Sequence, residues 1–246
     1  MSDVHTPPLR LDLRERIGWL HLSGPITLFF IDGLEEVCEQ LEEQQPCDTL
    51  VLMGSPEHFT QGIALSEFDP KKPLDIHGFH RWEKAVQRLE RLPCRTVALL
   101  RGACLGAGLQ LALACDVRLG VEGASLGLDE VAHGFLPGMA TWRLARFIGL
   151  GRARAMTSTA QRVSVARALE WGLVDEHLPS PYEPALEQWL AQLPPSHPVA
   201  LTLNRRLLEE SFSTPYEEAV GNFLAAQHRA ILSDGFQQTL RRREVS

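Results

Sequence analysis

The stretch that decides the fold is Arg101–Arg118, RGACLGAGLQLALACDVR. Four apolar residues, Val97–Leu100, come directly before it and predict a short buried strand. Within the stretch, three glycines favour a tight turn, and the apolar run Leu109–Ala114 predicts a buried helix. The first N–H groups of a helix lack partners and lie at the positive end of its dipole. The stretch therefore predicts a place for an anion, or for an oxygen that becomes anionic during a reaction.

Two other interpretations of the glycine turn compete with the anion site. Glycines between a strand and a helix also occur where the helix merely packs closely on the sheet. A dinucleotide-binding fingerprint would need a third glycine where Leu111 stands, so the sequence disfavours that interpretation. Gly102, Gly106 and Gly108 alone do not decide between close packing and an anion site, and the flanking segments are needed.

Composition excludes several classes of protein. The chain has 246 residues and a formal net charge of −7, without a basic block, so nucleic acid and anionic membrane surfaces are poor partners. Its five cysteines form no CxxC pair and no metal-ligand spacing with histidine, which favours reduced thiols, a cytoplasmic location and no metal. The N-terminal residues have no apolar signal-peptide core, and the longest uncharged apolar run, Gly102–Cys115, is too short to span a bilayer.

Strands alternate with helices as far as residue 180, which predicts an α/β core with much parallel pairing. After a glycine bend within His58–Leu65 and a polar surface loop over Asp69–Asp75, the helical spacing resumes. We expect two domains, an α/β core over 1–180 and a helical C-terminal subdomain over 181–246. The expected strands are 9–23 (two, with a bend at 15–16), 48–53, 97–100, 116–121 and 172–177. The expected helices are 30–45, 77–92, 109–114, 140–148, 149–160, 164–171, 184–193, 198–211 and 216–233.

Three pieces of the chain resemble one known family when they are taken together. They are HFTQGIAL at His58–Leu65, the glycine stretch extended to Leu119, and SLGLDEVAHGFLPG at Ser125–Gly138. Their order and flanking strands resemble the crotonase superfamily, the enoyl-CoA hydratase/isomerase group, from about Arg10 to the C-terminal helices. The resemblance implies an α/β fold with a ββα spiral core and a helical C-terminal trimerisation subdomain. It also implies homotrimers or hexamers of paired trimers.

The resemblance implies an oxyanion hole formed by two backbone N–H groups. One belongs to Ile63, after the glycine of the first piece, and the other to Ala107, between the two glycines at the helix start. Chemistry beside a thioester passes through an enolate, and such donors stabilise the negative charge that develops on its oxygen. The pantetheine of the substrate is expected to pass between the bend and the glycine turn. The residues expected to contact substrate are Gln61, Gly62, Gly106, Gly108, His133, Pro137 and Gly138.

The same resemblance identifies two positions for catalytic side chains, Gln110 and Glu130. Two-acid hydratases of the family carry glutamate at both, but an amide at position 110 can orient water or substrate and cannot act as a general base. Single-acid members shuttle one proton, and Glu130 in an apolar pocket would serve as base and then as acid. For His133, three residues after Glu130, an exposed position is favoured over one facing the pocket.

The resemblance leaves two functions open. The first is an enzyme that isomerises an enoyl thioester or dehydrates a 3-hydroxyacyl thioester with one acid. The second is an accessory protein of a polyketide pathway that acts as dehydratase, decarboxylase or non-catalytic partner of a synthase. The stretches His80–Pro93 and Leu136–Gly149 look like auxiliary hydratase-like proteins of the dihydroxyphenylacetyl-CoA pathway, and GFLPG at Gly134–Gly138 is similar to polyketide β-branching members. Either function needs an acyl-CoA or acyl-carrier-protein substrate, with coenzyme A or phosphopantetheine as carrier and no other cofactor.

Overall fold

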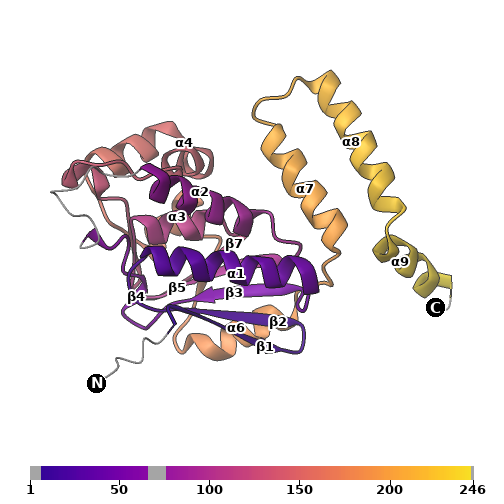
Figure 1. The fold of residues 1–246 in the computed structure, drawn as a ribbon, viewed down its shortest axis with the longest axis horizontal. Coiled ribbons are helices and arrows are strands. Elements are labelled where there is room, and N and C mark those ends of the chain that lie inside the picture. The colour runs from indigo at the N-terminus through magenta and orange to yellow at the C-terminus, as the bar shows by residue number, and fades with distance from the viewer. Residues whose placement is uncertain (1–6, 66–75, 245–246) are drawn as a thin grey trace.

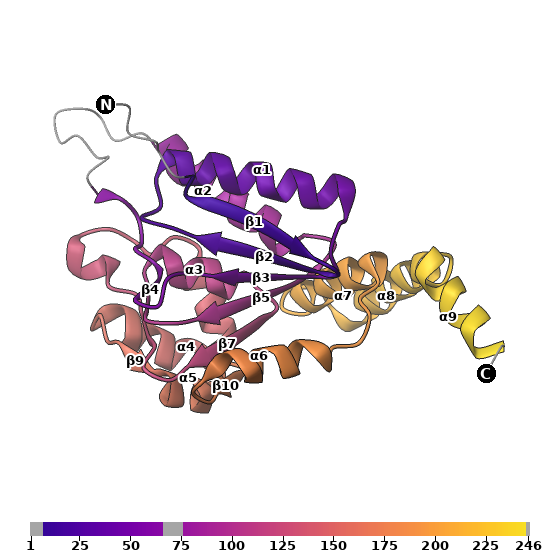
Figure 2. The same ribbon diagram turned by 90° about the horizontal axis from the view of Figure 1, so that it is seen from below.

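The structure, a computed structural model, describes residues 7–65 and 76–244. Its main sheet has six strands in the order β1-β2-β3-β5-β7-β10 (Figure 2). The strands β1 and β2 form an antiparallel hairpin, and all other pairs in this sheet are parallel. The strands are β1 (Leu9–Arg14), β2 (Ile17–Leu22), β3 (Thr49–Met53), β5 (Arg95–Leu100), β7 (Val117–Val121) and β10 (Glu176–Leu178).

Alternate residues of this sheet face two separate hydrophobic clusters. Leu50 and Leu52 of β3 face the larger cluster, whereas Val51 faces the smaller one. Because successive side chains of a strand point to opposite faces, a run of apolar residues is buried on both sides. Figure 1 shows α1, α2 and α3 on one face of the sheet and α6 on the other. An apolar run in this sequence therefore corresponds to a parallel strand that is buried on both faces of the sheet.

A second, smaller sheet has the order β4-β6-β8-β9. Its first three strands are parallel, and β9 pairs antiparallel with β8. The strands are β4 (His58–Thr60), β6 (Ala103–Leu105), β8 (Ser125–Gly127) and β9 (Val163–Ser164). The sequence analysis missed this sheet, because β6 is only three residues long and lies within the segment interpreted as one glycine turn.

Most of the helices begin and end within a few residues of the prediction. The expected helices 140–148 and 149–160 are two parts of α4, which is interrupted at Gly149, where φ is +77°. The helices of the core are α1 (Leu28–Gln44), α2 (Ile76–Glu90), α3 (Ala107–Leu113), the 3-10 helix η2 (Glu130–His133), α4 (Ala140–Ser158) and α5 (Val165–Trp171). Those after residue 180 are α6 (Tyr182–Ala191), α7 (Pro198–Glu210), α8 (Tyr216–Ile231) and α9 (Asp234–Glu244).

Two expectations about the later part of the chain were wrong. The strand expected over 172–177 begins only at Glu176, because Gly172 ends α5 in the left-handed conformation and the N–H of Leu173 bonds back to the Ala168 carbonyl at 2.8 Å. The helix α9 was not expected, since Phe236 and Leu240 are its only large apolar residues and give too weak a helical pattern. The loop expected over Asp69–Asp75 lies outside the described residues.

The C-terminal helices divide into one that packs on the sheet and an arm that projects from it. Leu186 and Leu190 of α6 belong to the smaller hydrophobic cluster, whereas α7, α8 and α9 project from the core (Figure 1). Arg205 of α7 ties the arm to the core through Asp116 and through the carbonyls of Leu92 and Cys94. The domain boundary between residues 180 and 181 stays a prediction. None of the helices within the described ranges combines the length and the apolar character needed to cross a membrane.

Candidate active site

The small sheet brings the three diagnostic pieces of sequence together. Its parallel strands β4, β6 and β8 end at Thr60, Leu105 and Gly127, and Leu105 pairs with Gly127 while Thr60 pairs with Cys104. The carboxyl ends of parallel neighbours meet at one edge of a sheet, where ligands of α/β proteins bind. The residues that follow each strand therefore share one site, although they are up to about seventy positions apart in sequence.

Gly106 makes the turn from β6 into α3, and this turn leaves the N–H of the next residue, Ala107, as a free donor. Its backbone lies at φ +55° and ψ −129°, a conformation that a side chain would strongly disfavour, and its N–H donates to the Gly127 carbonyl at 2.9 Å. The helix then begins at Ala107, whose N–H has no acceptor within the helix. This N–H points from the positive end of a fully buried helix, so it suits a developing negative charge.

The bend after β4 leaves a second backbone donor, the Ile63 N–H, without a partner among the described residues. The N–H of Gly62 donates to the Thr60 hydroxyl at 3.2 Å. The Gly62 carbonyl accepts from the Ile26 N–H, and the Ala64 N–H donates to the Ile26 carbonyl. The Ile63 N–H lies between these two bonds in sequence and makes no hydrogen bond to a described residue. The bend contacts α3 closely, because a Cβ added at Gly108 would lie only 2.6 Å from the Thr60 hydroxyl oxygen. The geometry thus brings the Ile63 bend against the first turn of α3.

Glu130 supplies a buried carboxyl group at the same place. Only 4% of the residue is exposed, and its Oε2 has no hydrogen-bond partner among the described residues. A Cβ added at Gly106 would lie 3.0 Å from Glu130 Oε1, so the carboxyl group lies directly against the turn that carries the Ala107 N–H. Burial away from water, with repulsion from Asp129 adding to it, raises the pKa of Glu130 above its ordinary value. A group of this kind can both release and accept a proton.

Gln110 lies one turn into α3 and is part of a side-chain network that the sequence did not reveal. Its Oε1 accepts from the Trp82 indole at 3.1 Å, and its Nε2 lies 2.8 Å from both carboxylate oxygens of Glu83. Glu83 Oε1 also accepts from the Met139 N–H at 3.0 Å. Helical spacing had marked Trp82 as a core or pocket residue but gave no signal for Glu83, because a lone glutamate on an amphipathic helix usually faces solvent.

The remaining residues expected to bind substrate surround this centre to different extents. His133 is exposed, in agreement with the favoured exposed position, and its Nε2 lies 3.9 Å from Asp129 Oδ2. Pro137 is buried and Gly138 lies against Glu83 and Gln110, while Gln61 is exposed. Their contacts with substrate stay predictions. In the described ranges, no group of three or more acidic, histidine or cysteine side chains is arranged to hold a metal ion.

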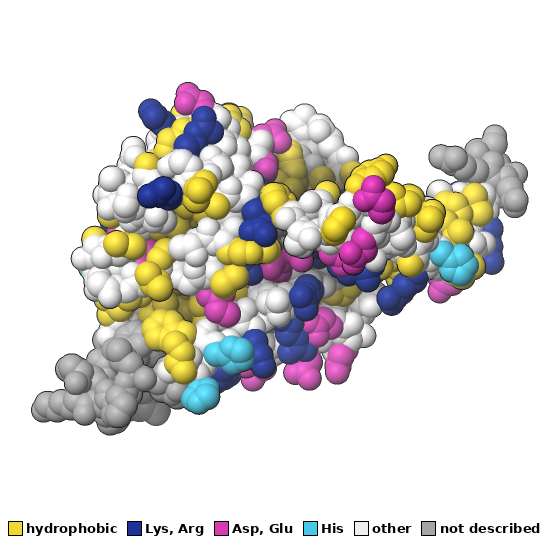
Figure 3. All heavy atoms as spheres, turned by 90° about the horizontal axis from the view of Figure 1, so that it is seen from above, with side chains coloured by type: hydrophobic (Ala, Val, Ile, Leu, Met, Phe, Trp, Pro, Cys, Tyr) yellow, Lys and Arg dark blue, Asp and Glu magenta, His cyan; other side chains and the backbone are white. Residues whose placement is uncertain are grey.

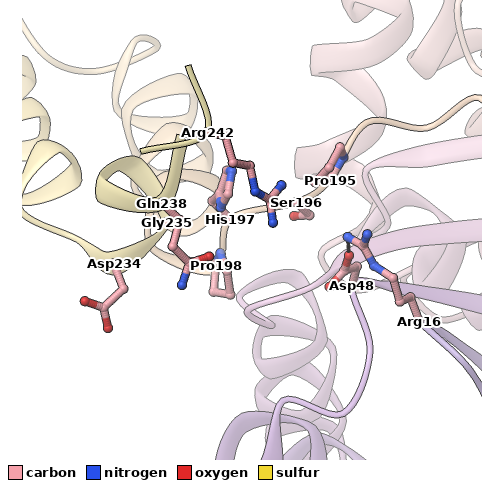
Figure 4. Close-up of a pocket in the computed structure, with 10 residues that line it drawn as sticks. All are labelled: Arg16, Asp48, Pro195, Ser196, His197, Pro198, Asp234, Gly235, Gln238 and Arg242. Carbon is pink, nitrogen blue, oxygen red and sulfur yellow. Dashed lines mark ion pairs between the residues drawn. The ribbon is translucent and has the colours of Figure 1, made fainter. Parts of the chain in front are cut away.

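Two cavities lie elsewhere, where the core meets the helical arm. The one shown in Figure 4, of about 380 Å³, lies between the Arg16–Asp48 ion pair and α9, with His197 and Arg242 among its walls. Arg16 and Asp48 directly precede β2 and β3, so this cavity is at the amino ends of these strands. The other, of about 280 Å³, lies between α4 and α7. Neither contains a residue of the candidate site.

The comparison with known families agrees with this geometry. Residues 22–242 match the family model described as enoyl-CoA hydratase/isomerase. This chain belongs to that family. The described fold also agrees with the α/β crotonase architecture that the resemblance implied, with two mixed sheets followed by C-terminal helices.

Individual relatives of this enoyl-CoA hydratase/isomerase family member support the assignment. A probable enoyl-CoA hydratase of Bacillus subtilis is 32% identical over 174 residues, which cover 70% of this chain and 62% of that relative. An enoyl-CoA-hydratase of Amycolatopsis orientalis is 30% identical over 219 residues, covering 86% and 94%. The crystal structure of an enoyl-CoA hydratase from Bacillus anthracis superposes with a TM-score of 0.85 at 26% identity over 96% of both chains. The chain is thus an enzyme of a family that acts on acyl-CoA thioesters.

The buried state of Glu130 predicts a pH-dependent stability. An unfolded glutamate ionises near pH 4.3, and the folded group ionises at higher pH. Between these two values the unfolded state has released the proton and the folded state has not, so wild-type stability falls as the pH rises. Glu130→Gln removes this loss. We therefore expect the variant to be more stable, relative to wild type, at pH 8 than at pH 4, with a correspondingly larger free energy of unfolding.

The measurement is urea denaturation at both pH values. Glu170→Gln, at an exposed position, is the matched control and should give the same difference from wild type at each pH. An equal difference for Glu130→Gln at both pH values would show that its carboxyl group is not desolvated in the folded protein.

Proposed function

We propose that the enzyme moves protons at an acyl-CoA thioester with Glu130 as its acid–base group. The reaction is either isomerisation of an enoyl group or dehydration of a 3-hydroxyacyl group. The observation that carries the proposal is the buried carboxyl group of Glu130, whose Oε2 has no hydrogen-bond partner among the described residues and whose Oε1 lies against the turn that holds the Ala107 N–H. A proton-transfer group beside a preorganised donor for the thioester oxygen is the arrangement that enolate chemistry requires.

In the proposed reaction the thioester oxygen accepts hydrogen bonds from the N–H groups of Ile63 and Ala107. Glu130 removes a proton beside the thioester, and the electron pair moves to that oxygen as an enolate. Isomerisation is completed when Glu130 returns the proton to the far end of the allylic system. Dehydration is completed when Glu130 protonates the leaving hydroxyl group, so that the C–O bond breaks and water departs. A preorganised donor of this type contributes about 3–4 kcal/mol to the transition state.

The proposed binding mode places the pantetheine between the Gln61–Gly62 bend and the Gly106–Gly108 turn. The acyl group then extends toward the loop after Glu130, with His133, Pro137 and Gly138. Several apolar side chains near this loop are exposed, including Val131, Leu136 and Met139. An acyl chain that covers them would remove apolar surface from water, which favours binding by about 25 cal/mol per Å².

A second candidate function is that of an accessory protein in polyketide biosynthesis. It would bind an acyl thioester, on coenzyme A or on a carrier protein, beside a partner synthase. The amide of Gln110, which cannot transfer a proton, favours this candidate, and the retained carboxyl group of Glu130 favours the enzyme. The similarity of 80–93 and 136–149 to proteins of the dihydroxyphenylacetyl-CoA pathway belongs to the same hypothesis. The cytoplasmic location inferred from the thiols also stays a prediction; all five cysteines are free and buried.

We further propose that the protein assembles as a homotrimer or as a hexamer of paired trimers. The arm exposes many apolar side chains, and Figure 3 shows hydrophobic side chains distributed along it. They include Leu208, Phe212, Phe223, Leu224 and Leu232. Exposed apolar surface of this extent marks an interaction site, and the family resemblance supports other copies of this chain as the partner.

The first prediction of this proposal concerns Glu130→Gln, which keeps the shape and hydrogen bonding of the side chain but removes the transferable proton. We expect unchanged affinity for an acyl-CoA and a loss of at least about 100-fold in proton transfer. The measurement is solvent-deuterium incorporation at the α and γ carbons of an enoyl-CoA. Exchange at the wild-type rate would exclude Glu130 as the acid and would favour the accessory function.

The second prediction concerns assembly. Sedimentation equilibrium should give a mass that is three or six times 27.4 kDa for the full chain. Truncation before Pro198 removes the arm and should leave an aggregated or monomeric product. A folded, active trimer from the truncated chain would contradict the proposed role of the arm.

A further inference from the structure

The carboxylate of Glu83 lies beside Gln110 of the candidate site but has no role in the proposed reaction. Glu83 projects from α2 and is half-buried. Among the described residues, no lysine, arginine or histidine forms an ion pair with it. A half-buried carboxylate without a counter-ion is unusual, because burial of a negative charge costs free energy unless a cation or several donors compensate.

The contacts of Glu83 fix it as a hydrogen-bond acceptor. The Trp82 indole can only donate, so it must meet the oxygen of the Gln110 side chain, as it does at 3.1 Å. The amide nitrogen of Gln110 is thereby directed at Glu83, at 2.8 Å from each oxygen. The Met139 N–H adds a third donor contact at 3.0 Å. Each group that hydrogen-bonds to Glu83 is a donor, and this arrangement suits a carboxylate that accepts a proton.

Glu83 is linked to Glu130 through α3 and through one loop. The two carboxyl groups lie against residues of the same turn of α3, since Glu130 contacts Gly106 and Glu83 contacts Gln110, four residues later. They are also joined by one loop, which begins with the Phe135 N–H bonded to the Glu130 carbonyl at 3.1 Å and ends at Met139. Gly138 in this loop leaves room for Glu83, because a Cβ there would lie 2.4 Å from Glu83 Oε1.

We propose that Glu83, held by Gln110 and Met139, is a second acid–base carboxylate of this site and that it activates water for addition to an enoyl thioester. This inference rests on the proposed function, because it uses the same oxyanion hole and the same Glu130. It assigns the reaction to reversible hydration and dehydration in place of isomerisation alone.

Glu83 accepts a proton from water while the water oxygen bonds to the β carbon of the enoyl thioester. The electron pair of the double bond moves to the thioester oxygen, which Ile63 and Ala107 stabilise as an enolate. The protonated carboxyl group of Glu130 then gives its proton to the α carbon, and the enolate becomes a saturated 3-hydroxyacyl thioester. The two carboxyl groups return to their starting states by exchange with solvent.

The different surroundings of the two carboxyl groups suit these different roles. Glu130 is dry and lacks a partner for one oxygen, and the raised pKa that follows from its burial favours the acid form. Glu83 is held by three donor contacts, from the Gln110 amide and the Met139 N–H, so its oxygens are positioned as acceptors. The two carboxyl groups thus differ in their hydrogen-bond partners, which supports assigning them different roles.

The test compares hydration of crotonyl-CoA with exchange of the α protons of butyryl-CoA in deuterium oxide. Exchange needs only the oxyanion hole and Glu130, whereas hydration also needs a base for water. Glu83→Gln can still accept from Gln110 and Met139, so the network survives while the base is lost. We expect the ratio of hydration rate to exchange rate to fall by about 100-fold or more in this variant. Glu42→Gln, which changes a carboxylate of α1 that is paired with Arg88 of α2, should leave the ratio at the wild-type value.

A second variant separates proton transfer from structural support. Glu83→Ala should lose hydration, and added formate should restore part of it, because a free carboxylate can occupy the space and accept the proton. A purely structural role of Glu83 would not give such rescue.

Three results would overturn the inference. The first is wild-type hydration by Glu83→Gln, and the second is an equal loss of hydration and exchange in that variant. The third is a wild-type protein that exchanges α protons but does not hydrate crotonyl-CoA, which would leave the proposed function intact. A wild-type protein that does neither would instead count against the proposed function itself.

Discussion

The register of three short parallel strands is the constraint on which the site depends. Because β4, β6 and β8 end side by side, the Ile63 bend, the α3 turn and Glu130 meet at one edge of the small sheet. A shift of one residue in any of these strands would turn its side chains to the opposite face. The Gly106 N–H bonded to the Gly127 carbonyl ties β6 to β8 at the point where the helix begins. The family assignment and the proposed chemistry both rest on this convergence.

Burial of α3 explains how an uncharged backbone can stabilise a negative charge. All seven residues of this helix are buried, so its N-terminal N–H groups lie in a region of low dielectric where electrostatic interactions are strong. The same burial makes the charged form of Glu130 costly, which reduces stability above the pKa of the unfolded group. Desolvation of Glu130 thus costs stability and also raises the pKa of the carboxyl group that we propose as the acid.

The sequence predicted the elements that have a clear apolar pattern and missed those that lack one. The apolar run at 97–100 predicted β5, because a strand buried on both faces has apolar residues at every position. The helical spacing over 77–92 predicted α2, because a helix buried on one face has apolar residues at helical intervals. The three-residue strand β6 was missed, since no period can be recognised over so few residues, and α9 was missed because it has few apolar positions.

The candidate site was predicted in part for a related reason. Ile63, Ala107 and Glu130 follow strand ends and belong to recognisable motifs, so their positions could be inferred. Glu83 could not, because its contact with Gln110 joins residues 27 positions apart and depends on how α2 packs over α3. Charge on an amphipathic helix gives no sign of whether a carboxylate faces solvent or a neighbouring amide.

Infrared spectroscopy of bound butyryl-CoA, labelled with ¹³C at the carbonyl, tests whether two backbone N–H groups polarise the thioester. We expect the carbonyl stretch at a lower frequency than in free butyryl-CoA. Ala107→Pro, which deletes one donor, should return the frequency toward the free value, while Ala107→Gly, which keeps it, should not. A bound carbonyl that absorbs at the frequency of the free thioester in the wild-type protein would contradict the account.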